Sequence, residues 1–364
     1  MTLTSLYHAG DPYDLLDSDG KADGLPHLET LPPDQLLREY DGINVAAPMV
    51  RYSKLPARFL FSRYETHITY TPMTLAREFA HSQIARDSDF TTNDRERGIF
   101  HMGTRRIRGC LVAQFAARNA ADFAQAVELV SPYVDGVDLN CGCPQPWAYK
   151  DEIGSYLLRQ PHLVQDMIKA ARARVSSDYS VSIKIRIDPD PKLTSRLVET
   201  AIHSGVSYIA VHGRTRHQRD SEPVNLQGIT FAREEAKGQV PIIGNGDVYQ
   251  LKDATTMRER TGVSGVMSAR GLLENPALYA GFNRTPLEAI DQFIDISTAT
   301  GLIFPLFHRH VAYMLEKHFA NKAERVFFNS LGSHAAVMDW FEDFLRKTRS
   351  EGGYSNSQNS RDCS

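Results

Sequence analysis

The chain has 364 residues, of which 42% are hydrophobic and 23% charged, and these near-average values exclude a chain that is disordered throughout. Its 41 basic and 44 acidic side chains give a net charge of −3, which excludes a histone-like, generally basic nucleic-acid binder. Four cysteines are too few for a disulfide framework, and no second Cys pair completes a zinc site, so we expect a reducing compartment and no metal.

The first forty residues are acidic and show no sustained hydrophobic period. They hold eight acidic residues against Lys21 and Arg38, a net charge of −6 that leaves +3 for the rest of the chain. Asp, Gly and Pro dominate this stretch, which predicts a flexible extension over residues 1–40. No signal-peptide pattern occurs, and no run approaches the ~20 apolar residues that span a bilayer. We therefore expect a soluble protein of the cytoplasm, with the nucleus as a second compartment and no membrane partner.

From residue 43 onward, short runs rich in β-branched residues alternate with stretches of helical spacing. The predicted strands cover residues 43–47, 67–70, 110–115, 136–139, 181–185, 208–211, 240–243 and 265–267. Eight parallel strands, each followed by a helix, predict a TIM (β/α)8 barrel over residues 41–285. A doubly wound sheet would carry a GxGxxG fingerprint, which is absent from the sequence.

After the predicted barrel, the strand pattern gives way to amphipathic helix over residues 286–350. This predicts a small all-helical domain, in which the Met and aromatic residues at helical steps are core rather than ligand contacts. Residues 351–364 are rich in Ser, Gly and Asn, which predicts a disordered tail.

Polar residues recur at the ends of the predicted strands, where a TIM barrel carries its site. They are Gln114 in the third strand, Asn140 after the fourth, Lys184 and Arg186 in the fifth, His212 and Arg214 after the sixth, Asn245 to Asp247 after the seventh and Arg270 after the eighth. Each alone could be a polar residue that caps a barrel layer, but together they indicate a site. The glycines and Arg270 of IIGNGD and MSARG lie where TIM barrels commonly bind phosphate.

The segment DLNCGCP, residues 138–144, is the most specific motif. Cys143 follows a strand end, where its side chain would reach a substrate, and a thiol of ordinary pKa is protonated at neutral pH and serves as a general acid. Cys141 is interpreted as a packing residue. Lys184 suits a second role, because a cation near a flavin ring stabilises the negative charge of its reduced form.

These motifs resemble the tRNA-dihydrouridine synthases, FMN enzymes with a barrel and a C-terminal helical domain. The resemblance runs through APMVRYSKLPAR, YTPM, VAQFAA, DLNCGCP, VSIKIR, VHGRT, GNGD and ARG, in family order over about residues 43–345. It implies FMN binding by Pro48, Met49, Val50, Gln114, Lys184, His212, Asn245, Gly246, Asp247, Ala269 and Arg270, and Cys143 as the catalytic acid. It further implies that Asn140, Arg186 and Arg214 contact the tRNA substrate, although the two arginines could instead hold ion pairs within the barrel.

The branch that acts at positions 20a and 20b of the D-loop is the most similar. By resemblance, NADPH or NADH reduces FMN, and hydride then passes to C6 of an extruded uridine while Cys143 protonates C5. Two other interpretations remain open: a small-molecule flavin oxidoreductase of the dihydroorotate dehydrogenase type, and a catalytically silent tRNA-binding protein. Residues 95–109 look like an insertion whose arginines either contact RNA phosphates or form a solvated loop.

Overall fold

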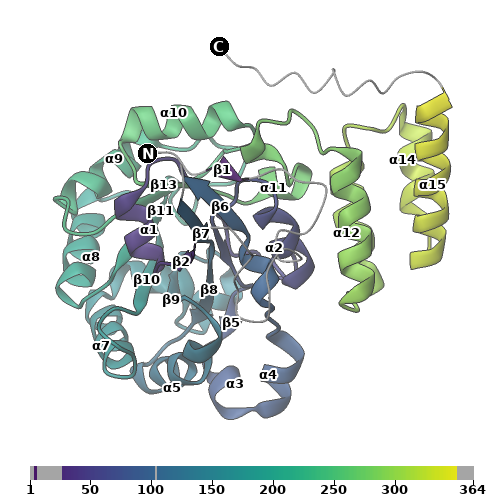
Figure 1. Cartoon of the computed structure of the whole chain (residues 1–364). Helices are drawn as coiled ribbons and strands as arrows, with labels where there is room; N and C mark the ends of the chain where they lie inside the picture. The colour runs from purple at the N-terminus through teal and green to yellow at the C-terminus, as the bar shows by residue number, and fades with distance from the viewer. Residues whose placement is uncertain (1–3, 6–26, 103–104, 351–364) are drawn as a thin grey trace.

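The computed structural model describes residues 4–5, 27–102 and 105–350. Eight parallel strands close into a barrel, with helices packed around it (Figure 1). In chain order the strands are β3 (Ile43–Ala46), β4 (Ile68–Tyr70), β8 (Cys110–Ala116), β9 (Gly136–Cys141), β10 (Ser180–Arg186), β11 (Tyr208–His212), β12 (Ile242–Asn245) and β13 (Gly265–Ser268). The pairs β13–β3 and β4–β8 complete the ring. The predicted TIM barrel is confirmed, and β12 begins two residues later than expected.

Helices cover the outside of the barrel. They are α2 (Leu55–Ser62), α3 (Ala76–His81), α4 (Gln83–Asp89), α5 (Ala120–Val130), α6 (Pro146–Lys150), α7 (Pro161–Arg172), α8 (Pro191–His203), α9 (Leu226–Glu235), α10 (Leu251–Thr261) and α11 (Arg270–Glu274). Local signals set several boundaries: Asn119 and Asp190 cap the N-termini of α5 and α8, and Gly262 ends α10 at φ 68°. Apolar faces of these helices and the outward side chains of the strands form the larger core.

A small sheet closes the end of the barrel where the strands begin. It contains β1 (Thr4–Ser5), β6 (Ile99–Met102), β7 (Arg105–Arg108) and β2 (Leu28–Thr30), in that spatial order, and α1 (Pro33–Glu39) lies beside it (Figure 1). Leu36, Leu37, Phe100 and Ile107 pack onto the apolar side chains of the barrel interior. Residues 27–40 are therefore folded, contrary to the expected flexible extension, because Leu36 and Leu37 supply apolar surface to bury. Residues 6–26 of that expected extension lie outside the described residues.

The stretch 95–109 belongs to this closing structure, so the expectation of an RNA-contacting or solvated loop is corrected for its described part. β6 and β7 pair as an antiparallel hairpin. Arg97 and Arg108 both donate to the carboxylate of Asp135, and Arg105 donates to Glu29. These arginines bind carboxylates at the end of the barrel opposite the predicted site.

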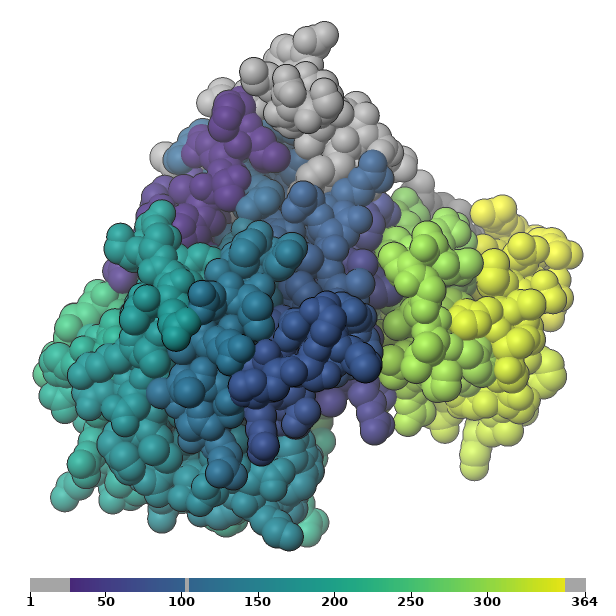
Figure 2. Space-filling view, turned by 90° about the horizontal axis from the view of Figure 1, so that it is seen from below, coloured from purple at the N-terminus to yellow at the C-terminus, as the bar shows by residue number. Residues whose placement is uncertain are grey.

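Four helices follow the barrel, as the amphipathic pattern predicts: α12 (Leu287–Ala299), α13 (Phe304–Leu315), α14 (Lys322–Asn329) and α15 (His334–Ser350). They form a lobe at the side of the barrel (Figure 2). Helix α12 packs on α2 and α13 on α11, so the lobe adjoins the loops of the first and last barrel strands. The aromatic residues are core, since Trp340 packs between Phe328 and Phe344 with ring centroids 4.9 and 5.2 Å away. The expected tail, 351–364, lies outside the described residues. No helix in the described part of the chain has the length and apolarity to cross a membrane.

Candidate active site

A chain of hydrogen bonds runs from the barrel interior to the loop that carries Cys143. Ser182 of β10 donates to Asp138 of β9 at 2.6 Å, and Gln114 of β8 donates to the other oxygen of Asp138 at 2.8 Å. Asn140 then donates to the side-chain oxygen of Gln114 at 2.9 Å. Burial raises the pKa of Asp138 to about 6, although Ser182 and Gln114 both donate to its carboxylate. Three adjacent strands are thus tied together directly below the mouth of the barrel.

The loop after β9 places Cys143 at this mouth. Its backbone N–H donates to Asn140 Oδ1 at 2.9 Å, and its carbonyl accepts from the N–H of Ser155 at 2.9 Å. Gly154, which precedes Ser155, has a φ of 63°. A Cβ atom at this position would lie 2.9 Å from Cys143 Cβ, so only glycine fits there. Cys143 is partly exposed, whereas Cys141 is buried and burial raises its pKa well above the ordinary value. Cys143 is therefore the thiol that a substrate at the mouth can reach.

Four cations surround the side chain of His212 at the end of β11. Burial, followed by the charges of Lys184, Arg186, Arg214 and Arg270, lowers the pKa of His212 to about 2, so its imidazole is neutral at physiological pH. Burial and then Arg186 lower the pKa of Lys184 to about 8. Burial and then Arg214 lower the pKa of Arg186 to about 10. Mutual repulsion of this kind favours an anionic ligand, which would relieve it.

The segment after β12 has an unusual backbone. Gly246 and Asp247 adopt φ angles of 130° and 52°, and a Cβ atom on Gly246 would lie 2.6 Å from Val224 and 3.1 Å from the His212 ring. The side chain of Asn245 donates to the carbonyl of Met267 at 2.9 Å, which joins β12 to β13. The backbone of Gly246 therefore lies close to the His212 ring, where any side chain larger than hydrogen would collide with Val224.

Asp247 connects the two arginines of the predicted site. It accepts from Arg214 and lies 3.7 Å from Arg270, which also pairs with Asp220 at 2.7 Å. Arg214 is only 3% exposed and also donates to the carbonyls of Asp220 and Glu222. These bonds hold the loop after β11, so the direct contact of Arg214 with substrate stays a prediction. Ala269 precedes Arg270 as the N-cap of α11.

The remaining predicted residues follow β3. The N–H of Met49 is bonded to the Ser53 hydroxyl at 2.9 Å, and its side chain is buried. Pro48 is half-buried, and Val50 is exposed. A groove of about 540 Å³ begins here, and it separates the loops after β3 and β4 from α13. Val50, Arg51, Lys54, Met73, Ile303 and Leu306 are among the residues that line it.

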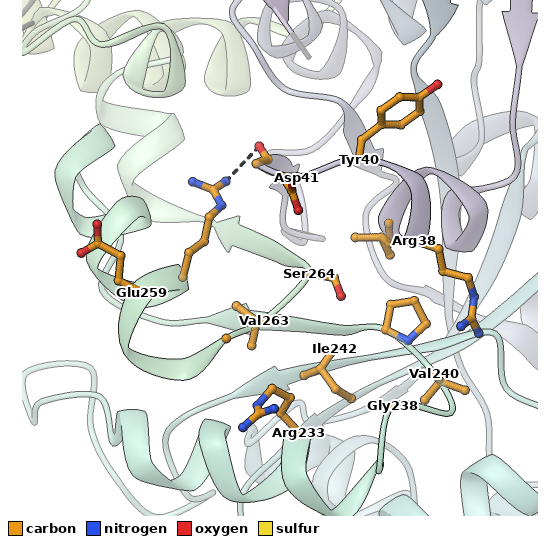
Figure 3. A pocket seen from close by; sticks show the side chains of 15 residues that line it. Arg38, Tyr40, Asp41, Arg233, Gly238, Val240, Ile242, Glu259, Val263 and Ser264 are labelled. Atoms are coloured by element: carbon orange, nitrogen blue, oxygen red, sulfur yellow. Dashed lines mark hydrogen bonds between the residues drawn. The ribbon is translucent and has the colours of Figure 1, made fainter. Parts of the chain in front are cut away.

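A larger pocket of about 770 Å³ lies at the opposite end of the barrel (Figure 3). Its wall includes Gly42 before β3, Ile242 at the start of β12 and Ser264 before β13. Pocket size therefore does not identify the site, because the strand ends that carry Cys143 and Lys184 lie far along the barrel axis from this pocket. In the described ranges, no group of three or more His, Cys, Asp or Glu side chains is arranged to hold a metal.

Sequence reasoning overlooked the supporting residues Asp138, Ser182 and Ser53. Asp138 lies within the DLNCGCP motif, and a carboxylate at an inward position of a barrel strand is a usable signal, because such positions are normally apolar. Ser182 and Ser53 carry no comparable signal, since their roles depend on which strand or loop lies next to them.

The chain is similar to known proteins over the barrel and the helical lobe. Residues 45–351 match the profile of the family described as "Dihydrouridine synthase (Dus)". The chain is 44% identical over 313 residues to a Mus musculus protein named "tRNA-dihydrouridine(20a/20b) synthase [NAD(P)+]-like", covering 85% of this chain and 91% of that protein. It is 43% identical to a Homo sapiens protein of the same name, covering 85% and 93%. A Schizosaccharomyces pombe "tRNA-dihydrouridine(20a/20b) synthase [NAD(P)+]" is 42% identical, covering 83% and 87%.

Proposed function

Because this chain belongs to the dihydrouridine synthase family, we propose that it is an FMN-dependent tRNA-dihydrouridine synthase. The proposed reaction reduces the C5–C6 double bond of uridines in the tRNA D-loop, at positions 20a and 20b, with NADPH or NADH as reductant. The names of relatives that share most of their length with this chain support the substrate and the positions. The observation that carries the proposal is the placement of Cys143 at the barrel mouth, beside a cationic site suited to an anionic cofactor.

The residues at the mouth fit FMN at both ends of that molecule. A neutral His212 among four cations, next to the backbone of Gly246, suits a phosphate. Gln114 of β8 and Lys184 of β10, which both pair with β9, carry amide and ammonium groups that suit the polar edge of a flavin ring. Met49 and Val50 would supply an apolar border. The proposal therefore keeps all the predicted cofactor residues, including Pro48, Asn245, Asp247, Ala269 and Arg270.

Bound flavin would supply the hydride, and the side chains of this protein supply position and a proton. Cys143 would donate its thiol proton to C5 of the uracil, and Asn140, which holds the backbone of Cys143, would orient both. Lys184 would stabilise negative charge that develops beside it, because its ammonium is poorly solvated. Arg186 and Arg214 would favour the approach of the tRNA backbone.

The lobe formed by α12 to α15 would contact the body of the tRNA. It lies beside the loops of β3 and β13, so a tRNA that reaches the mouth passes the groove lined by Arg51 and Lys54. A protein with this substrate belongs in the cytoplasm, with the nucleus as a second compartment.

The test uses protein purified with its flavin, reduced by NADPH under anaerobic conditions and mixed with unmodified tRNA. Reoxidation of the flavin with dihydrouridine at positions 20a and 20b is expected. Cys143→Ala should retain flavin and NADPH oxidation but lose product, whereas Cys141→Ala, which alters a buried packing thiol, should retain all three. A flavin that NADPH reduces but tRNA does not reoxidise would instead favour a small-molecule substrate, and failure to bind any flavin would contradict the proposal entirely.

A further inference from the structure

The short helix α6, three residues beyond Cys143, presents two large aromatic side chains to solvent. Trp147 is 46% exposed and Tyr149 is 37% exposed. Ala148 between them is buried in a small cluster with Ala116 and Ile153, against which Cys143 packs. The helix is therefore fixed beside the catalytic loop through Ala148, while its aromatic neighbours remain accessible.

Arg186 joins the loop that precedes this helix to the loop after β11. Its Nε atom donates to the carbonyl of Gly142 at 2.9 Å, and its Nη1 atom donates to the carbonyl of Thr215 at 3.1 Å. The next residue, Arg216, lies with its guanidinium 3.5 Å from the centroid of the Tyr149 ring. Tyr156 packs edge-on to the same ring at 5.4 Å. These contacts connect the loop of Cys143 and helix α6 to the loop that carries Arg216, and we call Trp147, Tyr149 and Arg216 the aromatic group.

The position of this group within the barrel suits a flexible strand of nucleic acid. β9 is the fourth barrel strand, whereas the helical lobe adjoins the first and the eighth. The aromatic group and the lobe therefore lie on opposite sides of the mouth. If the lobe holds the body of the tRNA, the strand that crosses the mouth would bring the nucleotides beyond the reacting uridine to α6.

We propose that Trp147, together with Arg216 on the ring of Tyr149 two residues further along α6, binds an unpaired tRNA nucleotide that flanks the reacting uridine. The base of that nucleotide stacks on the indole of Trp147, and the guanidinium of Arg216 meets its phosphate. This inference rests on the proposed function, since the flanking nucleotide is defined by the uridine at Cys143. Trp147 is a positioning residue: the stacked neighbour holds the strand open while the adjacent uridine is extruded.

Stacking suits the chemistry of such a substrate. Every base has a π face, so an aromatic platform tolerates any neighbour, and truncating it to Ala costs about 1–3 kcal/mol per base. The relatives are named for two consecutive positions, so the nucleotide beside the reacting uridine differs between the two reactions. A platform that does not read sequence would serve both.

The first experiment measures steady-state kinetics on unmodified tRNA with Trp147→Ala and Trp147→Phe. The alanine variant should raise the KM for tRNA by about 5- to 160-fold, which is the stacking loss of about 1–3 kcal/mol converted at 1.36 kcal/mol per tenfold. Phenylalanine should restore most of the affinity. Tyr133→Ala removes a residue of similar exposure, 57%, from η3 (Ser131–Tyr133) at the other end of β9, and should leave the KM unchanged.

Intrinsic fluorescence gives a second reading that does not depend on turnover. The chain has two tryptophans, and Trp340→Phe leaves Trp147 as the sole one. Unmodified tRNA should quench its emission, and a stem-only RNA helix without unpaired bases should quench it far less. Unchanged emission, or a Trp147→Ala variant with wild-type KM, would overturn the inference while the proposed function stands. If wild-type protein forms no dihydrouridine, the proposed function fails, and the emission still reports whether unpaired RNA stacks on Trp147.

Discussion

The side-chain oxygen of Asn140 accepts a hydrogen bond from the backbone N–H of Cys143 at 2.9 Å, while the side-chain nitrogen of Asn140 donates to Gln114. One amide therefore connects the loop of the proposed proton donor to the polar interior of the barrel. Because Gln114 is bonded in turn to Asp138, the position of Cys143 depends on polar side chains deeper in β8 and β9.

Asn140→Ala should lower the rate of tRNA reduction more than the rate of flavin reduction by NADPH. The variant leaves the N–H groups of Gly142 and Cys143 without their acceptor, and it should lower the free energy of unfolding by about 1–3 kcal/mol. Single-turnover rates for the two half-reactions and urea titration measure these effects. Asn140→Asp keeps the acceptor and should retain more tRNA reduction than Ala; equal losses in both half-reactions would contradict a role through Cys143.

Lys184→Met should stabilise the cofactor-free protein at neutral pH and weaken FMN binding. The pKa of Lys184 is lowered from 10.5 to about 8 by burial, so the unfolded chain binds more protons than the folded protein between those pH values. The free energy of unfolding of the wild type should therefore rise with pH across this window, by up to about 3 kcal/mol. The advantage of Lys184→Met should be largest below pH 8 and shrink towards pH 10.5, as measured by denaturant titration. A constant difference across this range would show that Lys184 does not titrate there.

Gly246→Ala should sharply reduce FMN affinity, because its Cβ atom would lie 2.6 Å from Val224 and 3.1 Å from the His212 ring in the proposed phosphate site. Gly238→Ala is the matched control, since Gly238 also has a positive φ but no atom within 4 Å of the added Cβ. The control should cost only the backbone strain, about 1 kcal/mol of unfolding free energy, with normal FMN binding. Quenching of flavin fluorescence gives both affinities, and similar affinities for the two variants would argue against a cofactor contact at Gly246.

Glu96→Ala should lower the free energy of unfolding by about 3–5 kcal/mol. Glu96 is fully buried and pairs with the equally enclosed Arg58, which also donates to the carbonyls of Ser53 and Thr91. Removing one partner leaves the other charge buried and unpaired. Arg346→Ala, which breaks an exposed pair with Asp343, should cost less than about 1 kcal/mol. The double variant Arg58→Met with Glu96→Leu should be more stable than Glu96→Ala; an additive loss would exclude this explanation.

The barrel was predictable because each strand is short, rich in β-branched residues and followed by a helical pattern. The closing sheet was not predictable from the sequence. β2 has only three residues, and β7, which pairs with β6, is rich in arginine, a composition typical of a solvated loop. The sequence alone suggests RNA or solvent as partners of Arg97 and Arg108, because Asp135, which binds both, lies at least 27 residues further along the chain. Pairing across such distances depends on the fold itself.

The sequence predicts which residues lie in the candidate site better than it predicts the hydrogen bonds and ion pairs between them. Strand ends converge in any TIM barrel, so Gln114, Asn140 and Lys184 were expected near one another. The ion pair between Arg214 and Asp247 depends on the conformation of the loop after β11, and no local sequence pattern predicts that conformation. Trp147 was overlooked for a related reason, because only the burial of Ala148 reveals which side of α6 faces solvent.

Among the described residues, the sheet formed by β1, β6, β7 and β2 covers the end of the barrel where the strands begin, and the candidate site lies at the other end. In the proposed reaction, the nicotinamide and the tRNA would both approach the site from that end, so they would bind in turn. Each would delay the other, so an excess of tRNA should slow the reductive half of the cycle, and the spent nicotinamide should depart before the uridine arrives. In that case the cover at one end of the barrel would impose an order of binding at the other.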